Sequence, residues 1–302
     1  MTSTGFENRR LRALIWIVRM LQRGRAMSLE QLSDKWVDEI EMSGGVEIER
    51  RTFRNYLNAI YELFGITIEC DRRNDYKYRI VEDESSPVIE HMMDNFEQNL
   101  ALGNAVELAD RILVDRAPRG NEHLQKIIRA MKKSRDITIV FQDFCDDEAW
   151  EVTGSPYCVK LYQQRWYVVI RDEEGHTDSY SLDRVLHVRV EKTKFQMDPS
   201  FSGEEFFRYS FGVRVNPEVE PMQLQLKVSS AQRGYFRSLP LHHSQQEVEI
   251  TPEYSIFIYE VVPTWELISK IFSYGDLVEV LAPKEYRQVV MEEVAALYHK
   301  YF

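Results

Sequence analysis

The sequence has little cysteine and no long apolar run, and both absences exclude classes of protein. Its three cysteines, Cys70, Cys145 and Cys158, are far apart and form no C-x-x-C pair. This spacing argues against a disulfide framework and against a thiolate metal site. No apolar stretch approaches the ~20 residues that a membrane-spanning helix needs. The first residues also lack the zones of a signal peptide, so we expect a globular, cytoplasmic protein with reduced thiols and no membrane partner.

Motifs of catalysis are absent as well. None of the seven histidines stands in an H-E-x-x-H frame, and the adjacent His242 and His243 have no carboxylate or cysteine pattern beside them. The chain has no phosphate-binding glycine loop and no nucleophile elbow. We therefore expect no enzyme, no metal site and no cofactor. The acidic stretch "FQDFCDDE" is most simply a solvated turn made by Asp143, Asp146, Asp147 and Glu148.

Basic charge is scarce in most of the chain but not in its first quarter. The net charge is -11. Residues 1–80 hold 14 Lys and Arg against 12 Asp and Glu, a balance of +2, and the other 222 residues hold 24 against 37, a balance of -13. Because charge is informative domain by domain, a phosphate-binding surface is expected in the N-terminal quarter.

Two helical patterns begin this quarter. Apolar residues recur at helical spacing between Leu11 and Leu21, which predicts one amphipathic helix. Ser28 and Gln31 have the spacing of a capping box, and the helix that follows is expected to have a buried stripe formed by Leu32, Trp36 and Ile40. The loop to the third helix is longer than the turn usual in a helix-turn-helix.

The third helix and the hairpin after it carry the predicted DNA contacts. An apolar stripe runs from Phe53 to Phe64, and "ITIECDRRNDYKYRI" then predicts two short strands around a basic turn. Three helices and such a wing predict a winged helix-turn-helix over residues 1–82, whose third helix enters the major groove of duplex DNA. The alternative is an ordinary solvated helix face. The predicted DNA-binding residues are Arg50, Arg51, Thr52, Arg54, Asn55, Asn58, Arg72, Arg73 and Lys77.

The rest of the chain changes pattern twice. Residues 87–134 have helical spacing and predict a connector, whose stripe around Met92, Met93, Phe96 and Leu100 suits packing on the same chain or contact with a second copy. Residues 135–205 alternate with period two. Short strands joined at "TGSP", "QQR" and "DEEG" favour a small antiparallel barrel, since no helices are available for crossovers.

The C-terminal residues 220–302 predict a ferredoxin-like domain. Their apparent order of elements is β-α-β-β-α-β, followed by a long last helix from Lys284. The fold class is therefore α+β and multidomain. In the second helix of this C-terminal domain, the residues expected to face the core are Trp265, Leu267, Ile268, Ile271 and Phe272.

Three short stretches of the strand-rich centre have a recognisable order. "PY" at 156–157, "WYV" at 166–168 and "YSLDRV" at 180–185 resemble the Pro-Tyr, Trp-Tyr-Leu and Phe-Arg-Leu-Asp-Arg-Ile elements of the WYL domain, a barrel of the Sm/SH3 type. With the N-terminal helices and the C-terminal extension, the resemblance to WYL transcription regulators covers essentially the whole chain. Ser181 stands where the family commonly has arginine.

The resemblance implies a ligand site on the barrel. WYL barrels are implied to bind a regulatory ligand, often nucleic acid or a nucleotide, through aromatic and basic side chains. Bases stack on aromatic faces for ~1–3 kcal/mol each, and guanidinium groups hold phosphate in a fork. Trp166 and Tyr167 point to opposite faces of a strand, so at least one is expected in the core. The predicted ligand-binding residues are Tyr157, Arg165, Trp166, Tyr167, Ser181 and Arg184.

Together these patterns predict a homodimeric transcription regulator that binds double-stranded DNA and responds to a nucleic-acid or nucleotide effector. One alternative is a nucleic-acid-binding accessory protein of a DNA-damage or foreign-DNA response that has no small effector. A second alternative is a nucleotide-processing hydrolase that uses the acidic turn.

Overall fold

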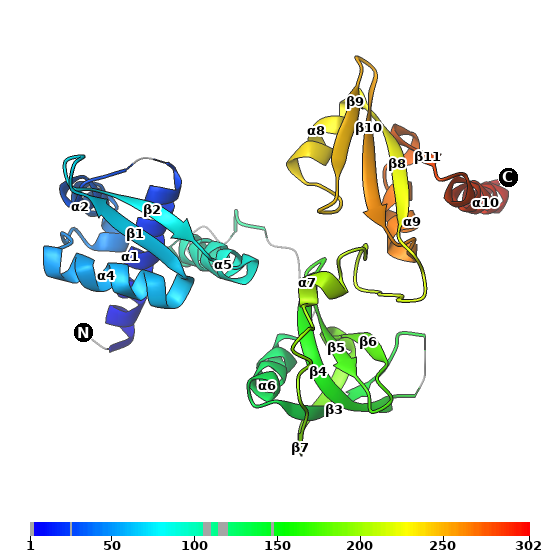
Figure 1. Ribbon diagram of the computed structural model, residues 1–302, viewed down its shortest axis with the longest axis horizontal. Helices are drawn as coiled ribbons and strands as arrows, with labels where there is room; N and C mark the ends of the chain where they lie inside the picture. Colours follow the sequence, from blue (N-terminus) through cyan, green and yellow to red (C-terminus); the bar gives the residue numbers. More distant parts are fainter. Residues whose placement is uncertain (1–2, 25, 105–109, 114–119, 146–147) are drawn as a thin grey trace. The chain divides into compact units, whose positions relative to one another are not determined.

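The computed structural model describes residues 3–24, 26–104, 110–113, 120–145 and 148–302 (Figure 1). Contacts divide the chain into two compact units, Met1–Val114 and Asp115–Phe302. In these described ranges, helices accompany three separate antiparallel sheets, which confirms a mixed, multidomain α+β architecture. No described helix is both long enough and apolar enough to cross a membrane.

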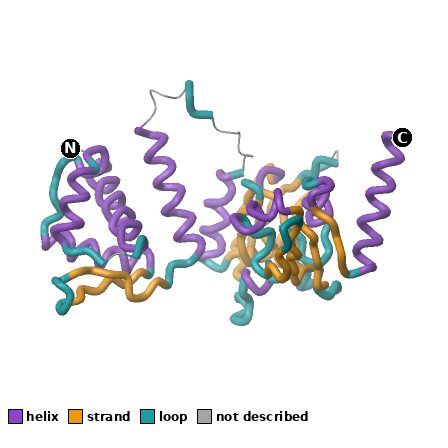
Figure 2. The backbone as a smooth tube through the Cα atoms, turned by 90° about the horizontal axis from the view of Figure 1, so that it is seen from above, coloured by secondary structure: helices purple, strands orange, loops and turns teal. Residues whose placement is uncertain are grey.

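Helices lie on one side of a two-stranded hairpin in the first unit (Figure 2). The hydrophobic core contains the apolar stripes that the sequence predicts, among them Leu14, Leu32, Phe53 and Phe64. The predicted order of helices and hairpin is confirmed. The elements are α1 (Ser3–Gln22), α2 (Leu29–Asp38), α3 (Ile40–Ser43), α4 (Arg50–Phe64), β1 (Ile66–Asp71), β2 (Lys77–Asp83) and α5 (Pro87–Asn104).

Helix α2 begins as predicted but ends early. Ser28 Oγ accepts a hydrogen bond from Gln31 N at 3.2 Å, and Gln31 Oε1 accepts one from Ser28 N at 3.0 Å, which completes the capping box. The helix ends at Asp38, and α3 starts at Ile40 in a new direction. Ile40 therefore leaves the apolar stripe of α2 and is 70% exposed. The prediction that it is buried is wrong, because helical spacing does not reveal the break at Glu39.

The predicted connector is divided between the two units. Met93 of α5 is buried in the core of the first unit, and Ile89 and Phe96 pack against that core. Arg19 of α1 fastens α5 further by pairing with the carboxylates of Glu90, Asp94 and Glu97. The next helix, α6 (Asn121–Lys132), packs in the second unit instead. Two of the four residues of the expected stripe, Met93 and Phe96, thus pack on their own chain, whereas Met92 is 47% exposed.

Helix α6 and a five-stranded antiparallel sheet form the strand-rich centre. Ile127 and Ala130 of α6 join the core residues of the sheet, so the helix covers one sheet face. The predicted turns at "QQR" and "DEEG" are confirmed between neighbouring strands. The strand order is β6-β5-β4-β3-β7. The strands are β3 (Arg135–Phe141), β4 (Trp150–Tyr162), β5 (Arg165–Arg171), β6 (Thr177–Ser181) and β7 (Val185–Lys194), with the 3-10 turn η2 (Leu182–Arg184) before β7.

The predicted turn at "TGSP" is wrong, because these residues lie inside β4. This long strand pairs with β3 up to Gly154 and with β5 from Ser155 onward. A Cβ atom on Gly154 would lie 2.4 Å from the backbone oxygen of Arg171, so glycine permits a close approach of two strands rather than a reversal of the chain. One strand therefore spans what the sequence presents as two.

A four-stranded antiparallel sheet with order β11-β8-β10-β9 forms the C-terminal part. The predicted β-α-β-β-α-β order is confirmed, and Leu267, Ile268 and Ile271 are buried. Trp265 is 62% exposed, which contradicts its predicted place in the core, because it begins α9 two positions before the buried stripe. The elements are β8 (Met222–Ser229), α8 (Ser230–Ser238), β9 (Gln246–Ile250), β10 (Tyr254–Val261), α9 (Trp265–Phe272), β11 (Val278–Ala282) and α10 (Lys284–Tyr301).

Candidate functional site

The solvent-facing side of α4 presents the basic and amide side chains that the sequence singles out. The buried side chains of this helix are Phe53, Ala59, Ile60 and Phe64. Their spacing leaves one continuous outer face, on which Thr52 is half-buried. The exposed predicted contacts on that face are Arg50, Arg51, Arg54, Asn55 and Asn58.

Two arginines stand where a helix favours acids. Arg50 and Arg51 occupy the first turn of α4, which contains no acidic residue, and the N-cap Glu49 makes no side-chain capping bond. Because a helix N-terminus carries partial positive charge, cations there oppose helix stability and anions bind well. The N-terminus of α4 is therefore suited to an anionic surface such as a phosphate backbone.

The hairpin is held beside the same end of α4. The ring of Tyr78 on β2 meets the ring of Phe53 edge-on, with 4.8 Å between centroids. Burial raises the pKa of Tyr78, and the nearby charges of Arg50 and Arg54 oppose that rise. The turn at residues 72–76 carries the exposed Arg72 and Arg73, and Lys77 follows it half-buried opposite Asp71. All predicted DNA contacts thus belong to two elements that pack together.

The basic side chains of α4 and of the hairpin turn have no ion-pair partner in the part of the chain that the structure describes. Side chains in this state can form charge-assisted bonds to phosphate without first losing a carboxylate. The surface formed by α4 and the β1–β2 turn, which we call the basic face, is the strongest candidate for nucleic-acid contact.

Sequence reasoning missed one cation beside this surface. Arg10 of α1 lines a shallow hollow on α4 together with Thr52, Asn55, Asn58 and Glu62. Burial raises the pKa of Tyr56, and the nearby charges of Arg9 and Arg10 oppose that rise. The run "ENRRLR" was available as a signal, but its position relative to α4 depends on how α1 packs.

The predicted ligand residues of the five-stranded sheet do not form one site. Tyr167 on β5 lies opposite Lys160 on β4 and Ser181 on β6, so these three share one face. Trp166 lies on the other face and packs against the hydrophobic core. The structure therefore separates the two neighbouring aromatics, and Trp166 is the structural one.

Arg165 and Ser181 converge on one carboxylate. Asp183 in η2 accepts hydrogen bonds from Arg165 Nη1 and from Ser181 Oγ. The Asp183 side chain is 9% exposed, whereas Arg165 keeps about a third of its surface in solvent. Ser181 is fully buried, so it orients Asp183 and is not open to a ligand. Only the outer side of Arg165, next to Tyr167 on the same face, remains available within this group.

Arg184 turns to a different place. Its Nη1 donates to Asp143 Oδ2 at 3.1 Å, and its guanidinium lies over the rings of Phe141 and Phe144, 5.1 and 5.5 Å from their centroids. Phe141 in turn meets Tyr180, which shares the sheet face of Trp166. Arg184 therefore packs on the sheet face opposite to that of Tyr167. Of the predicted acidic turn, Asp146 and Asp147 lie outside the described residues.

Tyr157 is a packing residue at the far end of the sheet. It is buried between Phe195, whose ring stacks on it at 6.0 Å, and Phe201, whose ring meets it edge-on at 4.9 Å. Its hydroxyl accepts a hydrogen bond from Arg171 Nη1 at 3.1 Å. A ligand would have to displace these rings to reach Tyr157.

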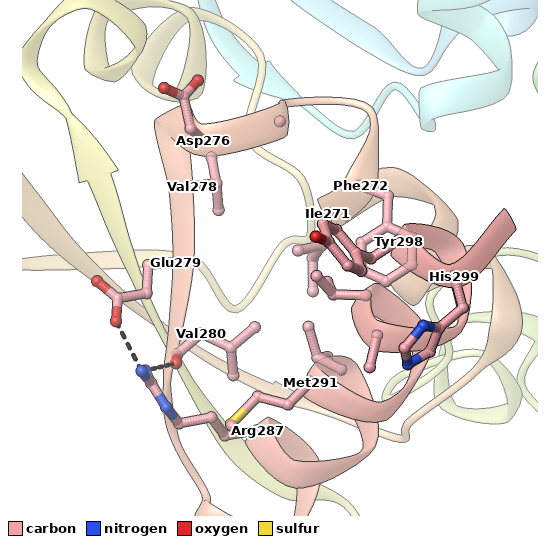
Figure 3. A pocket seen from close by; sticks show the side chains of 14 residues that line it. Ile271, Phe272, Asp276, Val278, Glu279, Val280, Arg287, Met291, Tyr298 and His299 are labelled. Atoms are coloured by element: carbon pink, nitrogen blue, oxygen red, sulfur yellow. Dashed lines mark hydrogen bonds and ion pairs between the residues drawn. The ribbon is translucent and has the colours of Figure 1, made fainter. Parts of the chain in front are cut away.

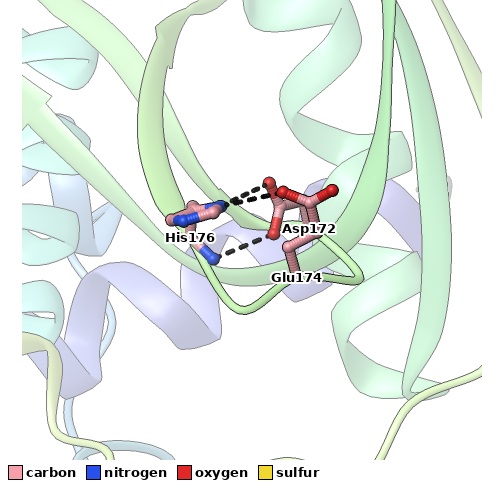
Figure 4. Close-up of side chains that lie close together, drawn as sticks. All are labelled: Asp172, Glu174 and His176. Carbon is pink, nitrogen blue, oxygen red and sulfur yellow. Dashed lines mark hydrogen bonds and ion pairs between the residues drawn. The ribbon is translucent and has the colours of Figure 1, made fainter.

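Two histidine groups invite a metal interpretation. His176 pairs with Asp172 and Glu174 in the exposed β5–β6 turn, at 3.4 and 3.5 Å from its Nδ1 (Figure 4). The turn itself is closed by the backbone amide of His176, which donates to Asp172 Oδ1 at 2.9 Å. In the adjacent pair, His242 Nδ1 lies 2.8 Å from Ser244 Oγ, and His243 Nε2 lies 2.7 Å from the oxygen of Arg208. Both groups thus make contacts within the chain, although His242 Nε2 is buried without a hydrogen-bond partner among the described residues.

An apolar groove of about 680 Å³ lies between α10, α9 and β11 (Figure 3). Ile271, Phe272 and Tyr298 lie together at one end of it. At the other end, Arg287 Nη2 pairs with Glu279 Oε1 at 2.8 Å. Met291 and Val294 of α10 line the groove and are 54% and 50% exposed. The last helix therefore presents apolar side chains that its own domain does not cover.

Comparisons with solved structures give distant similarities. Proteasome accessory factor B/C (PafBC) of Arthrobacter aurescens is 17% identical with a TM-score of 0.36, over 94% of this chain and 46% of that chain. A CRISPR Cas-related protein is 12% identical with a TM-score of 0.36, over 98% of this chain and 84% of that chain. This chain thus spans less than half the length of the first of these. No curated protein matches it.

Two stretches of the chain match protein families. Residues 122–190, which comprise α6 and nearly all of the five-stranded sheet, match the WYL domain. Residues 220–298, which comprise the four-stranded sheet and most of α10, match the WCX domain. The family resemblance of the centre is confirmed, and the chain contains a WYL domain followed by a WCX domain.

Proposed function

We propose that this chain is a cytoplasmic transcription regulator that binds double-stranded DNA through a winged helix-turn-helix in its first unit. In this proposal α4 enters the major groove, where arginine recognises guanine and asparagine recognises adenine, and the β1–β2 turn contacts phosphates. The single observation that supports it most is the basic face, whose arginines are exposed and unpaired within the described chain. The proposed regulator is not an enzyme.

The test is duplex binding by the full-length protein. Fluorescence anisotropy against a duplex selected from a random library, and against a random duplex, should give a preference of about 10³-fold or more if α4 reads bases. A protein that binds neither duplex at low salt would contradict the proposal. Equal binding of both would leave only a nonspecific role.

We expect Arg72→Ala with Arg73→Ala to reduce the salt dependence of binding. Each phosphate contact contributes about -0.9 to the slope of log affinity against log salt, so losing two contacts should make the slope less steep by about two. The ratio of specific to nonspecific affinity should stay nearly unchanged. The matched control is Lys192→Ala with Lys194→Ala on the exposed end of β7. An unchanged slope in the Arg72 and Arg73 variant would exclude the hairpin turn from the interface.

We further propose that the WYL domain senses a nucleic-acid or nucleotide effector at the face that carries Arg165 and Tyr167. Tyr167 can stack on a base, and Arg165 can reach a phosphate from its exposed side. The DNA-binding units would have two arrangements, and the effector would favour the arrangement to which it binds more tightly.

One observation favours the alternative of an accessory protein without a small effector. Three arginines of the WYL domain are already engaged, since Arg165 and Arg184 bond carboxylates and Arg171 bonds the Tyr157 hydroxyl. Ser181 also supplies no cation where the family has arginine. An anionic effector must therefore compete with Asp183 for Arg165. Duplex binding that no nucleotide or oligonucleotide alters would favour this alternative.

The proposed regulator is a homodimer, and the α10 groove is where we expect the second copy. The groove and the exposed stripe on α10 adjoin each other in the same chain, so one two-fold contact, with α10 of each copy in the groove of the other, would cover both. A contact of this kind removes the apolar surface of two grooves and of two α10 helices from water at once.

Charge placed in this groove should separate the copies. Met291→Glu with Val294→Glu would bury two unpaired carboxylates in the contact, so the variant should sediment as a monomer at micromolar concentration where the wild type is a dimer. Ala296→Glu, on the same exposed helix but outside the groove lining, should remain dimeric. A dimeric Met291 and Val294 variant would move the contact elsewhere, and a monomeric wild type would refute the homodimer.

A further inference from the structure

Residues 201–214, which we call the strap, connect the WYL sheet to the WCX domain and are fastened to both. On the WYL side, the ring of Phe201 meets Tyr157 edge-on at 4.9 Å. On the WCX side, Val262 N donates to the oxygen of Tyr209 at 2.8 Å, and Thr264 Oγ1 donates to the oxygen of Phe211 at 3.0 Å. Figure 1 shows the short helix α7 (Gly203–Phe206) of the strap between the two sheets.

Lys160 is the cation that joins the WYL sheet to the far half of the strap. Its Nζ donates to the backbone oxygen of Gly212 at 2.6 Å. The same ammonium lies 3.9 Å from the centre of the Phe207 ring, within the range of a cation–π interaction. One side chain from β4 thus holds two separate points of the strap.

The face from which Lys160 projects is the proposed effector face. Lys160 and Tyr167 are directly opposite each other on β4 and β5, so their side chains are cross-strand neighbours. Tyr162 lies two residues further along β4. Burial raises the pKa of Tyr162, and the nearby Glu266 of α9 and Tyr167 raise it further. The effector face therefore borders the strap and the WCX domain.

Burying the amine of Lys160 at this position costs free energy. Burial lowers its pKa to about 8, although the nearby Cys158 acts in the opposite direction. A methionine could fill the same space without the desolvation cost of an amine. The two contacts to the strap offset that cost only while the strap stays in place. At Gly212, the φ of +100° and the close Glu266 side chain fix the backbone that presents the accepting oxygen.

We propose that Lys160 is a positioning residue that holds the strap against the WYL sheet and passes a change at Tyr167 to the WCX domain. The holding role is independent of DNA binding. The second role deepens the proposed effector function, since it gives the route by which an occupied Tyr167 face reaches the C-terminal domain. A shift of Tyr167 displaces Lys160, its cross-strand neighbour. Lys160 then loses or regains its hydrogen bond to Gly212 and its contact with the Phe207 ring together.

The experiment is hydrogen exchange on the full-length protein followed by mass spectrometry. Amides of Phe207, Arg208, Ser210 and Val262 are hydrogen-bonded in or to the strap and serve as reporters. Lys160→Met should accelerate exchange at these amides about tenfold, as expected for the loss of a charge-assisted bond, while β8 and β10 stay protected. Lys160→Arg, which keeps the donor and the charge, should remain close to wild type. Lys192→Met on β7 is the matched control for removal of a surface lysine.

The route is tested by a double-mutant cycle that needs no ligand. Tyr167→Ala alone should accelerate exchange in the strap, and it should add little in the Lys160→Met background, because both act through one contact. Wild-type exchange in Lys160→Met, or faster exchange throughout the WYL sheet, would overturn the holding role. Additive effects in the cycle would overturn the route. Failure of the proposed DNA-binding function would be seen in the duplex titration instead. The outcome of that titration does not depend on either exchange experiment.

Discussion

Replacing Arg51 and Arg54 together with alanine is expected to weaken binding to the specific duplex by about 30-fold or more, and to random duplex far less. An arginine that donates two hydrogen bonds to guanine contributes about 1–3 kcal/mol of discrimination, or about 5- to 150-fold in affinity. Both side chains are exposed on the outer face of α4, and neither pairs with a described carboxylate. Their loss should therefore remove base recognition without disturbing the core of the first unit.

The measurement is a pair of titrations at fixed salt, one with each duplex. Lys126→Ala with Arg129→Ala removes the same charge from exposed positions on α6 in the other unit, and it should bind both duplexes as the wild type does. An equal loss on both duplexes in the Arg51 and Arg54 variant would mean that α4 anchors phosphates and reads no bases. Circular dichroism of both variants checks that the helices are intact.

The basic face could be predicted because its signals are local. A helical stripe from Phe53 to Phe64 specifies which side of α4 is buried, and the remaining positions must then face outward. The hairpin turn is likewise specified by a short basic sequence between two alternating stretches. Arg10 could not be assigned in this way, since its place beside α4 follows from the packing of α1.

The WYL sheet shows what local signals leave undetermined. Strand alternation places Trp166 and Tyr167 on opposite faces, but it does not say which face packs on α6. The partners of Arg165 and Arg184 come from η2 and from Asp143, at sequence distances of 18 and 41 residues. Such pairs depend on register, which no single stretch encodes. The six predicted ligand residues were therefore of suitable type but lie in separate places.

The junction with the WCX domain was missed for the same reason. Lys160 is an unremarkable strand residue in the sequence, and its acceptor is a backbone oxygen 52 residues away. Nothing in the pattern around Gly212 signals that contact. At Gly154 the opposite occurs, since glycine and proline predict a turn locally while tertiary contact between β4 and β5 keeps the strand continuous.

Arg165→Ala with Tyr167→Ala is expected to abolish any change in duplex affinity caused by a single-stranded oligonucleotide or a mononucleotide. Tyr167 supplies the stacking surface, worth about 1–3 kcal/mol per base, and Arg165 supplies the nearest partly exposed guanidinium on that face. The response is measured as the ratio of duplex affinity with and without each probe. Duplex affinity without a probe should stay at the wild-type value, because the basic face belongs to the other unit.

The arrangement around Asp183 makes the same site testable by a gain of binding. Asp183→Asn keeps the shape of the side chain but weakens its hold on Arg165, so a phosphate-bearing probe should bind more tightly and respond more steeply to salt. Arg184→Ala is the control, since its guanidinium lies over Phe141 and Phe144 on the opposite face; the response should persist in this variant. If Arg184→Ala abolished the response and the Arg165 and Tyr167 variant retained it, the effector would bind at η2 and Asp143 instead. In that case Tyr167, and with it the route through Lys160, would have no part in sensing.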